Sequence, residues 1–176
     1  MITKEQQIWL DHLSDTDKIS IIPYNPETKR VFKRIKNDLI KVLGKTRISH
    51  RGSTNLKISG QGEIDLYIPT AKKQFNIQLE KLINYLGEPG SLYPLKRVRF
   101  FRYIDDIKIE LFLINKNDSG WKESVVFEKY LKHNRKALLE YEKIKLECNG
   151  CSVREYYTKK TAFINKILLF SKNMVN

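Results

Sequence analysis

Residues 63–68 read Glu-Ile-Asp-Leu-Tyr-Ile, and this stretch decides the fold that we expect. Its apolar and polar side chains alternate strictly, and a strand presents alternate side chains on opposite faces. The two isoleucines and the leucine therefore share one face, while Glu63 and Asp65 share the other face with Tyr67. We expect a half-buried strand that ends at Pro69.

The residues that follow this strand predict further sheet and helix. Residues 71–86 carry apolar side chains at helical spacing. Residues 97–104 and 107–114 are typical of two strands joined around the polar pair Asp105-Asp106. The order of elements predicts a mixed α/β (α+β) fold, with a mixed sheet flanked by helices and a C-terminal helical cluster.

The segment before the strand predicts a helix that Asn25-Pro26 opens and Gly44 closes. A further helix is predicted over residues 4–13, with Ile8, Trp9 and Leu13 on one side, and a strand over 46–50. Three more helices are predicted over 120–133, 135–147 and 154–172. The last of these buries Phe163, Ile164, Ile167, Leu168 and Phe170. The 176 residues are the usual length of one domain. We expect a single domain over 1–176, with a sheet-containing core over 1–118 and C-terminal helices over 119–176 packed on it.

The composition points to an anionic partner. Lys and Arg total 33 and Asp and Glu total 20, so the formal net charge is +13. Such a surplus makes nucleic acid a possible partner, although a lysine-rich composition also places lysine on inert surfaces. No apolar run approaches the ~20 residues of a membrane span, and the N-terminus lacks a signal-peptide core. We therefore expect a cytoplasmic protein without a membrane partner.

The two cysteines, Cys148 and Cys151, are spaced as Cys-Asn-Gly-Cys. A structural zinc site takes four ligands, and there is no second cysteine pair. A redox CxxC motif opens a helix after a strand, whereas this pair follows a helical stretch. We interpret the pair as two reduced cysteines in a turn.

Two stretches carry polar residues that could hold a nucleotide. In Arg51-Gly52-Ser53-Thr54, glycine allows close approach of the backbone, and the hydroxyl and N–H groups can hold phosphate oxygens. On the strand, Glu63 and Asp65 lie roughly 6.5–7 Å apart along the chain and can converge on a hard cation. Taken alone, the first stretch is an ordinary turn and the second a solvated acidic face.

Glu110 is the third candidate, in the apolar stretch 109–114. A carboxylate in such a strand needs a partner or a metal, because burying a bare charge is costly. The alternative is that Glu110 faces solvent on an edge strand together with Lys108.

The whole pattern resembles the nucleotidyltransferase superfamily: Gly52-Ser53, nine residues, the strand pair Glu63-x-Asp65, and Glu110 on a later strand. The C-terminal half is similar to the GrpB family of that superfamily. The residues that carry this likeness are Trp121, Phe127-Glu128-Lys129-Tyr130-Leu131-Lys132, Ala137, Tyr141, Lys145, Tyr156, Lys160 and Phe163-Ile164. Glu128-Lys129 stand where the family has Arg-Asp, and Glu110 stands on the strand where it often has histidines.

The resemblance implies a nucleotidyltransferase-like fold and transfer of a nucleoside monophosphate from an NTP to an acceptor hydroxyl, the acceptor being RNA, protein or a small molecule. Glu63, Asp65 and Glu110 would then be the catalytic and metal-binding residues, with Mg²⁺ or Mn²⁺ as cofactor. Gly52 and Ser53 would contact the phosphates, with Arg51, Lys145 and Lys160 as cationic candidates; the two lysines could equally be solvated helix residues. GrpB-type domains also occur fused to a coenzyme A biosynthetic kinase, so a non-catalytic module that binds a nucleotide, RNA or a coenzyme is the alternative.

Overall fold

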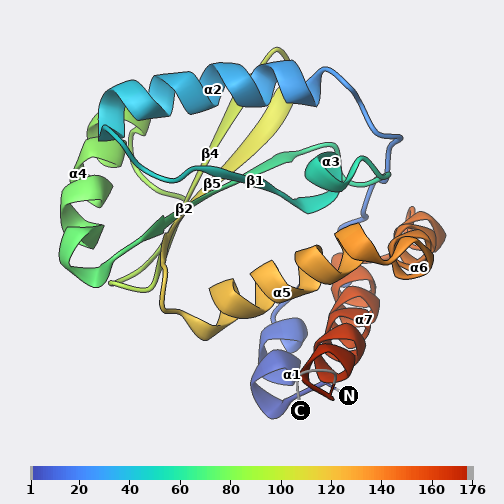
Figure 1. Ribbon diagram of the computed structural model, residues 1–176. Coiled ribbons are helices and arrows are strands. Elements are labelled where there is room, and N and C mark those ends of the chain that lie inside the picture. Colours follow the sequence, from blue (N-terminus) through green and yellow to red (C-terminus); the bar gives the residue numbers. More distant parts are fainter. Residues whose placement is uncertain (1, 174–176) are drawn as a thin grey trace. The chain divides into compact units, whose positions relative to one another are not determined.

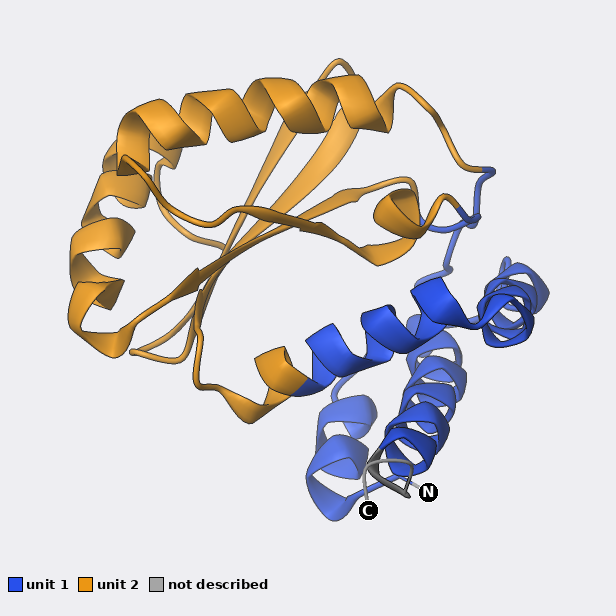
Figure 2. Ribbon diagram, viewed as in Figure 1, with its two compact units in different colours: residues 1–23, 58–61, 123–176 blue, residues 24–57, 62–122 orange. Residues whose placement is uncertain are grey.

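The computed structural model describes residues 2–173, and the chain divides into two compact units (Figure 2). Residues 24–57 and 62–122 form the sheet unit. Residues 1–23, 58–61 and 123–176 form the helical unit, so the N-terminal segment belongs with the C-terminal helices. A single domain whose helices pack on the core stays a prediction.

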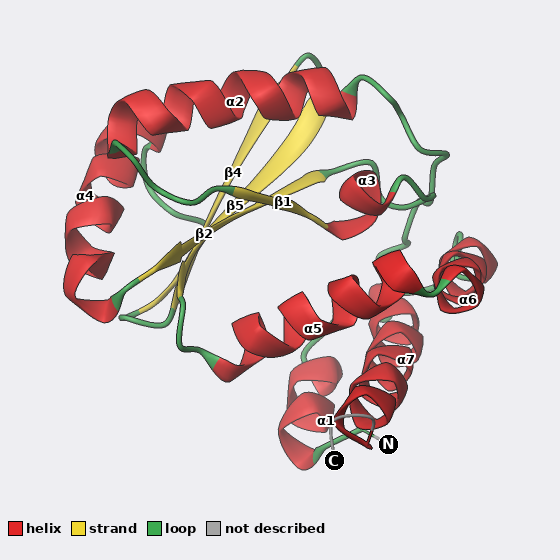
Figure 3. Ribbon diagram, in the orientation of Figure 1, coloured by secondary structure: helices red, strands yellow, loops and turns green. Residues whose placement is uncertain are grey.

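The sheet unit contains a five-stranded mixed sheet (Figures 1 and 3), which confirms the expected fold class. Its central pair is parallel, and the remaining pairs are antiparallel. The hairpin between the fourth and fifth strands turns through Asp105 and Asp106, whose φ angles of 51° and 60° suit the right-handed twist of a two-residue turn. The strand order is β1 (Ser49–Arg51), β2 (Ile64–Thr70), β5 (Ile107–Asn115), β4 (Arg97–Ile104) and β3 (Ser91–Tyr93).

Two helices, α2 (Thr28–Leu43) and α4 (Phe75–Leu86), cover one face of this sheet. The predicted alternation along β2 holds, since its apolar residues are fully buried and the residues between them are partly exposed. The opposite face of the central strands is therefore left for polar and aromatic side chains. The shared core consists of Val31, Ile35, Leu39, Leu43, Ile48, Ile64, Leu66, Ile68, Phe75, Leu82, Val98, Phe100, Ile109, Leu111 and Leu113.

Several element boundaries differ from those predicted. Helix α2 begins at Thr28 rather than at Pro26, because Asn25 first closes a turn by accepting a hydrogen bond from the Glu27 N–H. Strand β2 continues through Pro69, where β1 no longer pairs with it, so the missing N–H of proline is tolerated. Strand β1 occupies 49–51 rather than 46–50, and a short 3₁₀ helix, η1 (Lys72–Gln74), precedes α4.

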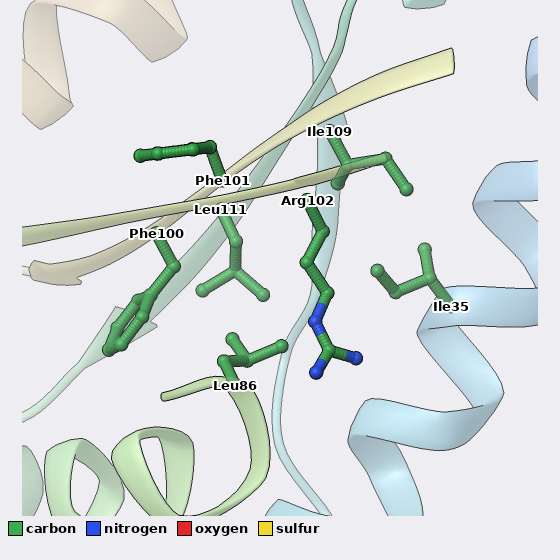
Figure 4. A pocket seen from close by; sticks show the side chains of 7 residues that line it. All are labelled: Ile35, Leu86, Phe100, Phe101, Arg102, Ile109 and Leu111. Atoms are coloured by element: carbon green, nitrogen blue, oxygen red, sulfur yellow. The ribbon is translucent and has the colours of Figure 1, made fainter. Parts of the chain in front are cut away.

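A small crevice lies between the sheet and its two covering helices. Its volume is about 10 Å³, which is room for one water molecule at most. Figure 4 shows the Arg102 side chain lying between Ile35 and Leu86. The Arg102 guanidinium donates a hydrogen bond to the Tyr85 carbonyl (3.2 Å) and stacks on the Tyr85 ring. This crevice is a packing feature and not a ligand site.

The helical unit contains α1 (Lys4–Asp11), most of α5 (Ser119–His133), α6 (Arg135–Glu147) and α7 (Val153–Asn173). The prediction for the buried side of α1 is wrong, because Leu10 is fully buried whereas Ile8 is 61% exposed and Trp9 is 45% exposed, although the Trp9 ring contacts that of Tyr157. On α7, Phe163 is buried as expected but Phe170 is exposed. None of the helices within the described part of the chain is long and apolar enough to cross a membrane.

The two cysteines are free thiols at the end of α6. Burial and a hydrogen bond with Cys151 raise the pKa of the Cys148 thiol to about 11. Cys148 packs with Ile19, Ile21 and Tyr156 in a small cluster of buried residues. The thiol at 148 therefore stays protonated at neutral pH, as a structural and unreactive group.

We expect Cys148 to resist alkylation at pH 8. With a pKa of about 11, roughly one thiol in a thousand is ionised at that pH, against about one in ten at the ordinary pKa. Iodoacetamide should thus label Cys148 at least about 100-fold more slowly in the native protein than in denaturant. Peptide mapping by mass spectrometry measures both rates, with Cys148→Ser identifying the peptide. Equal native and denatured rates would contradict the buried thiol.

Candidate functional site: a carboxylate cluster beside a glycine turn

The central parallel strand pair brings the three candidate carboxylates together. Asp65 on β2 is the register partner of Glu110 on β5, and Glu63 immediately precedes β2 on the same face. Each residue offers a carboxylate oxygen, and these oxygens lie within 4.8 Å of one another. The side chains of Glu63 and Glu110 are only 18% and 12% exposed. The strand pattern thus predicts a convergence that the β2–β5 pairing produces.

Gly52 closes the turn that faces Asp65. The predicted turn is the start of a short helix, α3 (Gly52–Leu56), directly after β1, and Arg51 is the register partner of Asp65. Gly52 has a φ of +74°, and a methyl group added to it would overlap the Asp65 carboxylate, whose carbon would be 3.0 Å away. Glycine is needed here because no side chain fits between this turn and the carboxylate.

Thr54 ties α3 to the start of β2. The Thr54 hydroxyl donates to the Glu63 carbonyl (3.1 Å) and therefore accepts a hydrogen bond from Nε2 of His50 (2.9 Å). The His50 ring in turn stacks on Phe32 of α2, with centroids 4.6 Å apart. The Gly52-Ser53 turn is thus held at a fixed place beside the cluster.

Lys108 is a cluster residue whose role the sequence reasoning missed. Its ammonium donates to Glu110 (2.7 Å) and to Glu63 (3.2 Å). Burial by itself lowers the pKa of Lys108, but the hydrogen bond to Glu110 and the charge of Glu63 outweigh it, so the pKa is raised and the group stays cationic. The Arg99 guanidinium is 3.8 Å from Glu110. The Lys-x-Glu spacing at 108–110 is the signal in the sequence, since it puts both side chains on one strand face.

Arg51 rests on an aromatic stack on the same face of the sheet. Its guanidinium carbon is 5.4 Å from the Trp121 ring, which stacks on Tyr67 at the same centroid distance. Tyr67 stacks on Phe112 at 4.6 Å. Trp121 is therefore a packing residue at the start of α5, and no sequence pattern indicates that it also supports Arg51.

A separate groove of about 230 Å³ lies between α2 and the β1–α3 turn. Three lysines line it, and none of its lining residues is acidic. The groove therefore combines positive charge with flat ring faces, which suits an anionic ligand that carries a ring. The lysines are Lys29, Lys33 and Lys57, and the rings are those of Tyr24, Phe32 and His50.

Lys145 and Lys160, the other two cationic candidates, belong to the helical unit. Lys145 on α6 is 3% exposed, with its ammonium 4.8 Å from the Tyr141 ring. The Lys160 ammonium on α7 lies 5.6 Å from the Tyr156 ring and 5.0 Å from the Tyr157 ring. Neither is a fully solvated surface lysine, and their contact with phosphate stays a prediction.

The donor set of the cluster fits a divalent cation. Carboxylate oxygens are the ligands that Mg²⁺ and Mn²⁺ prefer. Around an octahedral Mg²⁺ ion at about 2.1 Å, ligand oxygens lie no more than about 4.2 Å apart. The cluster oxygens lie within 4.8 Å of one another, so they need at most a small side-chain rotation to close on an ion. Glu63, Asp65 and Glu110 are the residues that could hold one.

The fold and the site define an α/β protein with a mixed sheet, helices on one face and a candidate cation cluster on the other. The family model described as "GrpB protein" matches residues 18–169, so the chain belongs to the GrpB family. A UPF0157 protein of Vibrio cholerae serotype O1 is 22% identical over 147 residues, which are 82% of this chain and 78% of that protein. The conserved protein GrpB from Enterococcus faecalis has a similar crystal structure, with a TM-score of 0.66 at 16% identity, covering 89% of this chain and 99% of that one. The family resemblance seen in the sequence is thereby confirmed.

Proposed function

We propose that this protein is a metal-dependent nucleotidyltransferase that moves a nucleoside monophosphate from an NTP to an acceptor hydroxyl. The observation that carries the proposal is the convergence of Glu63, Asp65 and Glu110 beside the Gly52 turn. A site that binds phosphate without chemistry has no need for three carboxylates, because they repel a phosphate group. Carboxylates that hold a cation can instead bring a triphosphate to the same place.

Each residue has a distinct part in this proposal. Glu63 and Asp65 hold Mg²⁺ or Mn²⁺, which when bound neutralises charge on the triphosphate and on the leaving pyrophosphate. Ser53 and the backbone N–H groups of the Gly52 turn hold phosphate oxygens. Glu110 accepts the proton of the acceptor hydroxyl.

The cationic side chains complete the phosphate site in this proposal. Arg51, braced on Trp121, presents a fork of donors to the phosphates. Lys145 and Lys160 of the helical unit are further cationic candidates, on the family resemblance alone. The acceptor is RNA, a protein or a small molecule, and the net charge of +13 favours an anionic one. The reaction belongs in the cytoplasm, where NTPs and reduced thiols occur together.

A thermal-shift titration tests the proposal. Each of the four NTPs is added with and without Mg²⁺, and the preferred NTP should raise the melting temperature by roughly 5 °C or more at about 100 times its Kd, with Mg²⁺ only. The same NTP, labelled at the α-phosphate, is then incubated with RNA, protein and small-molecule acceptors. The absence of any Mg²⁺-dependent shift would contradict the metal-dependent enzyme.

The lysine-lined groove favours a second candidate, a non-catalytic module that binds a nucleotide, RNA or a coenzyme. Lys29, Lys33 and Lys57 can hold an anion without a metal, beside the rings of Phe32 and His50. On this alternative the thermal shift is independent of Mg²⁺ and disappears in the double variant Lys29→Gln/Lys33→Gln. The enzyme proposal expects that variant to retain the Mg²⁺-dependent shift.

A further inference from the structure

The Lys108 ammonium lies within the carboxylate cluster and therefore affects how many divalent ions the cluster can hold. The ammonium nitrogen is 2.7 Å from a Glu110 oxygen and 3.2 Å from a Glu63 oxygen. These are distances of charge-assisted hydrogen bonds, not of a loose surface pair. Two of the three candidate metal ligands thus already share a positively charged partner.

The strands fix Lys108 in this position. Lys108 and Glu110 are two residues apart on β5, so their side chains leave the same face. Extending the β2–β5 register by one residue from the Ile64–Ile109 pair places Lys108 beside Glu63. The lysine is a cross-strand neighbour of one carboxylate and a same-strand neighbour of the other, so its backbone cannot move away while the sheet is intact.

The charges in the cluster suit one divalent ion. Three carboxylates and one ammonium carry a formal charge of minus two, or minus one if the Arg99 guanidinium is counted, so a single divalent ion already neutralises the group. A second divalent ion would leave the group with two net positive charges and would stand next to the ammonium. Arg99, 3.8 Å from Glu110, adds to that repulsion.

We propose that Lys108 takes the place of a second divalent ion beside Glu110, so that the site holds a single Mg²⁺ or Mn²⁺ ion through Asp65 and Glu63. This inference rests on the proposed function and adds to it the number of divalent ions that the site holds, which is one. The ammonium balances the negative charge of the Glu110 carboxylate when an anionic triphosphate approaches. A second ion would otherwise balance that charge.

Counting bound Mn²⁺ without nucleotide tests this assignment separately from the enzyme activity. Free Mn²⁺ is measured by electron paramagnetic resonance during titration of the full-length chain. We expect one ion per wild-type chain at saturation. Lys108→Met should bind two ions, or bind its first ion at least about tenfold more tightly, because a like charge has been removed. Lys81→Met, which removes an exposed charge on α4, should match the wild type.

The variant Lys108→Arg keeps a cation at this position and should also bind one ion, which covers the case in which the methionine variant does not fold. Two ions per wild-type chain, or a folded Lys108→Met that binds like the wild type, would overturn the inference while leaving the nucleotide proposal intact. Failure of every variant to bind Mn²⁺ would overturn it as well. A Mg²⁺-independent NTP shift in the wild type, with the Mn²⁺ counts as expected, would instead remove the proposed function alone.

Discussion

Asp65→Asn should abolish the Mg²⁺-dependent part of NTP binding and lower nucleotidyl transfer by about 100- to 1,000-fold, the range seen when one preorganised electrostatic group is removed. Asparagine keeps the shape of the side chain but loses the charge and one anionic oxygen that a hard cation requires. The measurements are the NTP thermal shift with and without Mg²⁺ and the initial rate of transfer from a labelled NTP.

The fold should survive this substitution. Asp65 lies on the face of β2 opposite the buried Leu66, so the core is untouched. Without metal, loss of one of three neighbouring charges should hold or raise the melting temperature. Asp106→Asn, the same change in the exposed β4–β5 turn, is the matched control and should leave both readouts unchanged. Equal metal-independent shifts in the wild type and Asp65→Asn would favour the binding module.

The alternating pattern of 63–68 was sufficient to predict which face of β2 is buried. It carries its own register information, because a strand that slipped by one residue would bury Glu63 and Asp65. The same pattern predicted that the two carboxylates share a face. The alternating pattern does not predict which strand pairs with β2. The parallel pairing with β5 joins residues 45 positions apart and depends on the whole sheet.

The features that the sequence could not predict each have a physical reason. The sequence leaves open whether Lys108 lies in solvent beside Glu110, because a Lys-x-Glu spacing looks the same on an exposed edge and at an interior strand. The prediction of which side of α1 is buried is also wrong, because Leu10 is fully buried and the larger Trp9 is partly exposed. A short helix with few apolar residues has no periodicity strong enough to orient it. The close approach of the Gly52 turn to the Asp65 carboxylate depends on the β1–β2 pairing, which no local pattern shows, and the contact of this turn with phosphate stays a prediction.

Gly52→Ala should destabilise the protein and also remove its metal response. Alanine at a φ near +74° costs about 1–2 kcal/mol. The new methyl group would in addition overlap the Asp65 carboxylate, and such overpacking costs about 1–3 kcal/mol. Either Asp65 or the start of α3 must then move. Denaturant unfolding gives the free energy, and Mn²⁺ titration reports whether Asp65 still reaches the cluster.

Gly44→Ala separates these two effects, because it isolates the backbone cost. Gly44 ends α2 in the same unit with a φ of +77°, and an added methyl group would meet no atom within 4 Å. With a ψ of −159°, Gly44 lies in a backbone region that is essentially restricted to glycine, so we expect the alanine variant to lose about 1–3 kcal/mol of unfolding free energy and to keep the wild-type Mn²⁺ response. The excess loss in Gly52→Ala then measures the contact with Asp65. If the two variants lost equal stability and bound Mn²⁺ alike, glycine at 52 would be a requirement of the turn alone, and the close approach to the carboxylate would have no part in shaping the site.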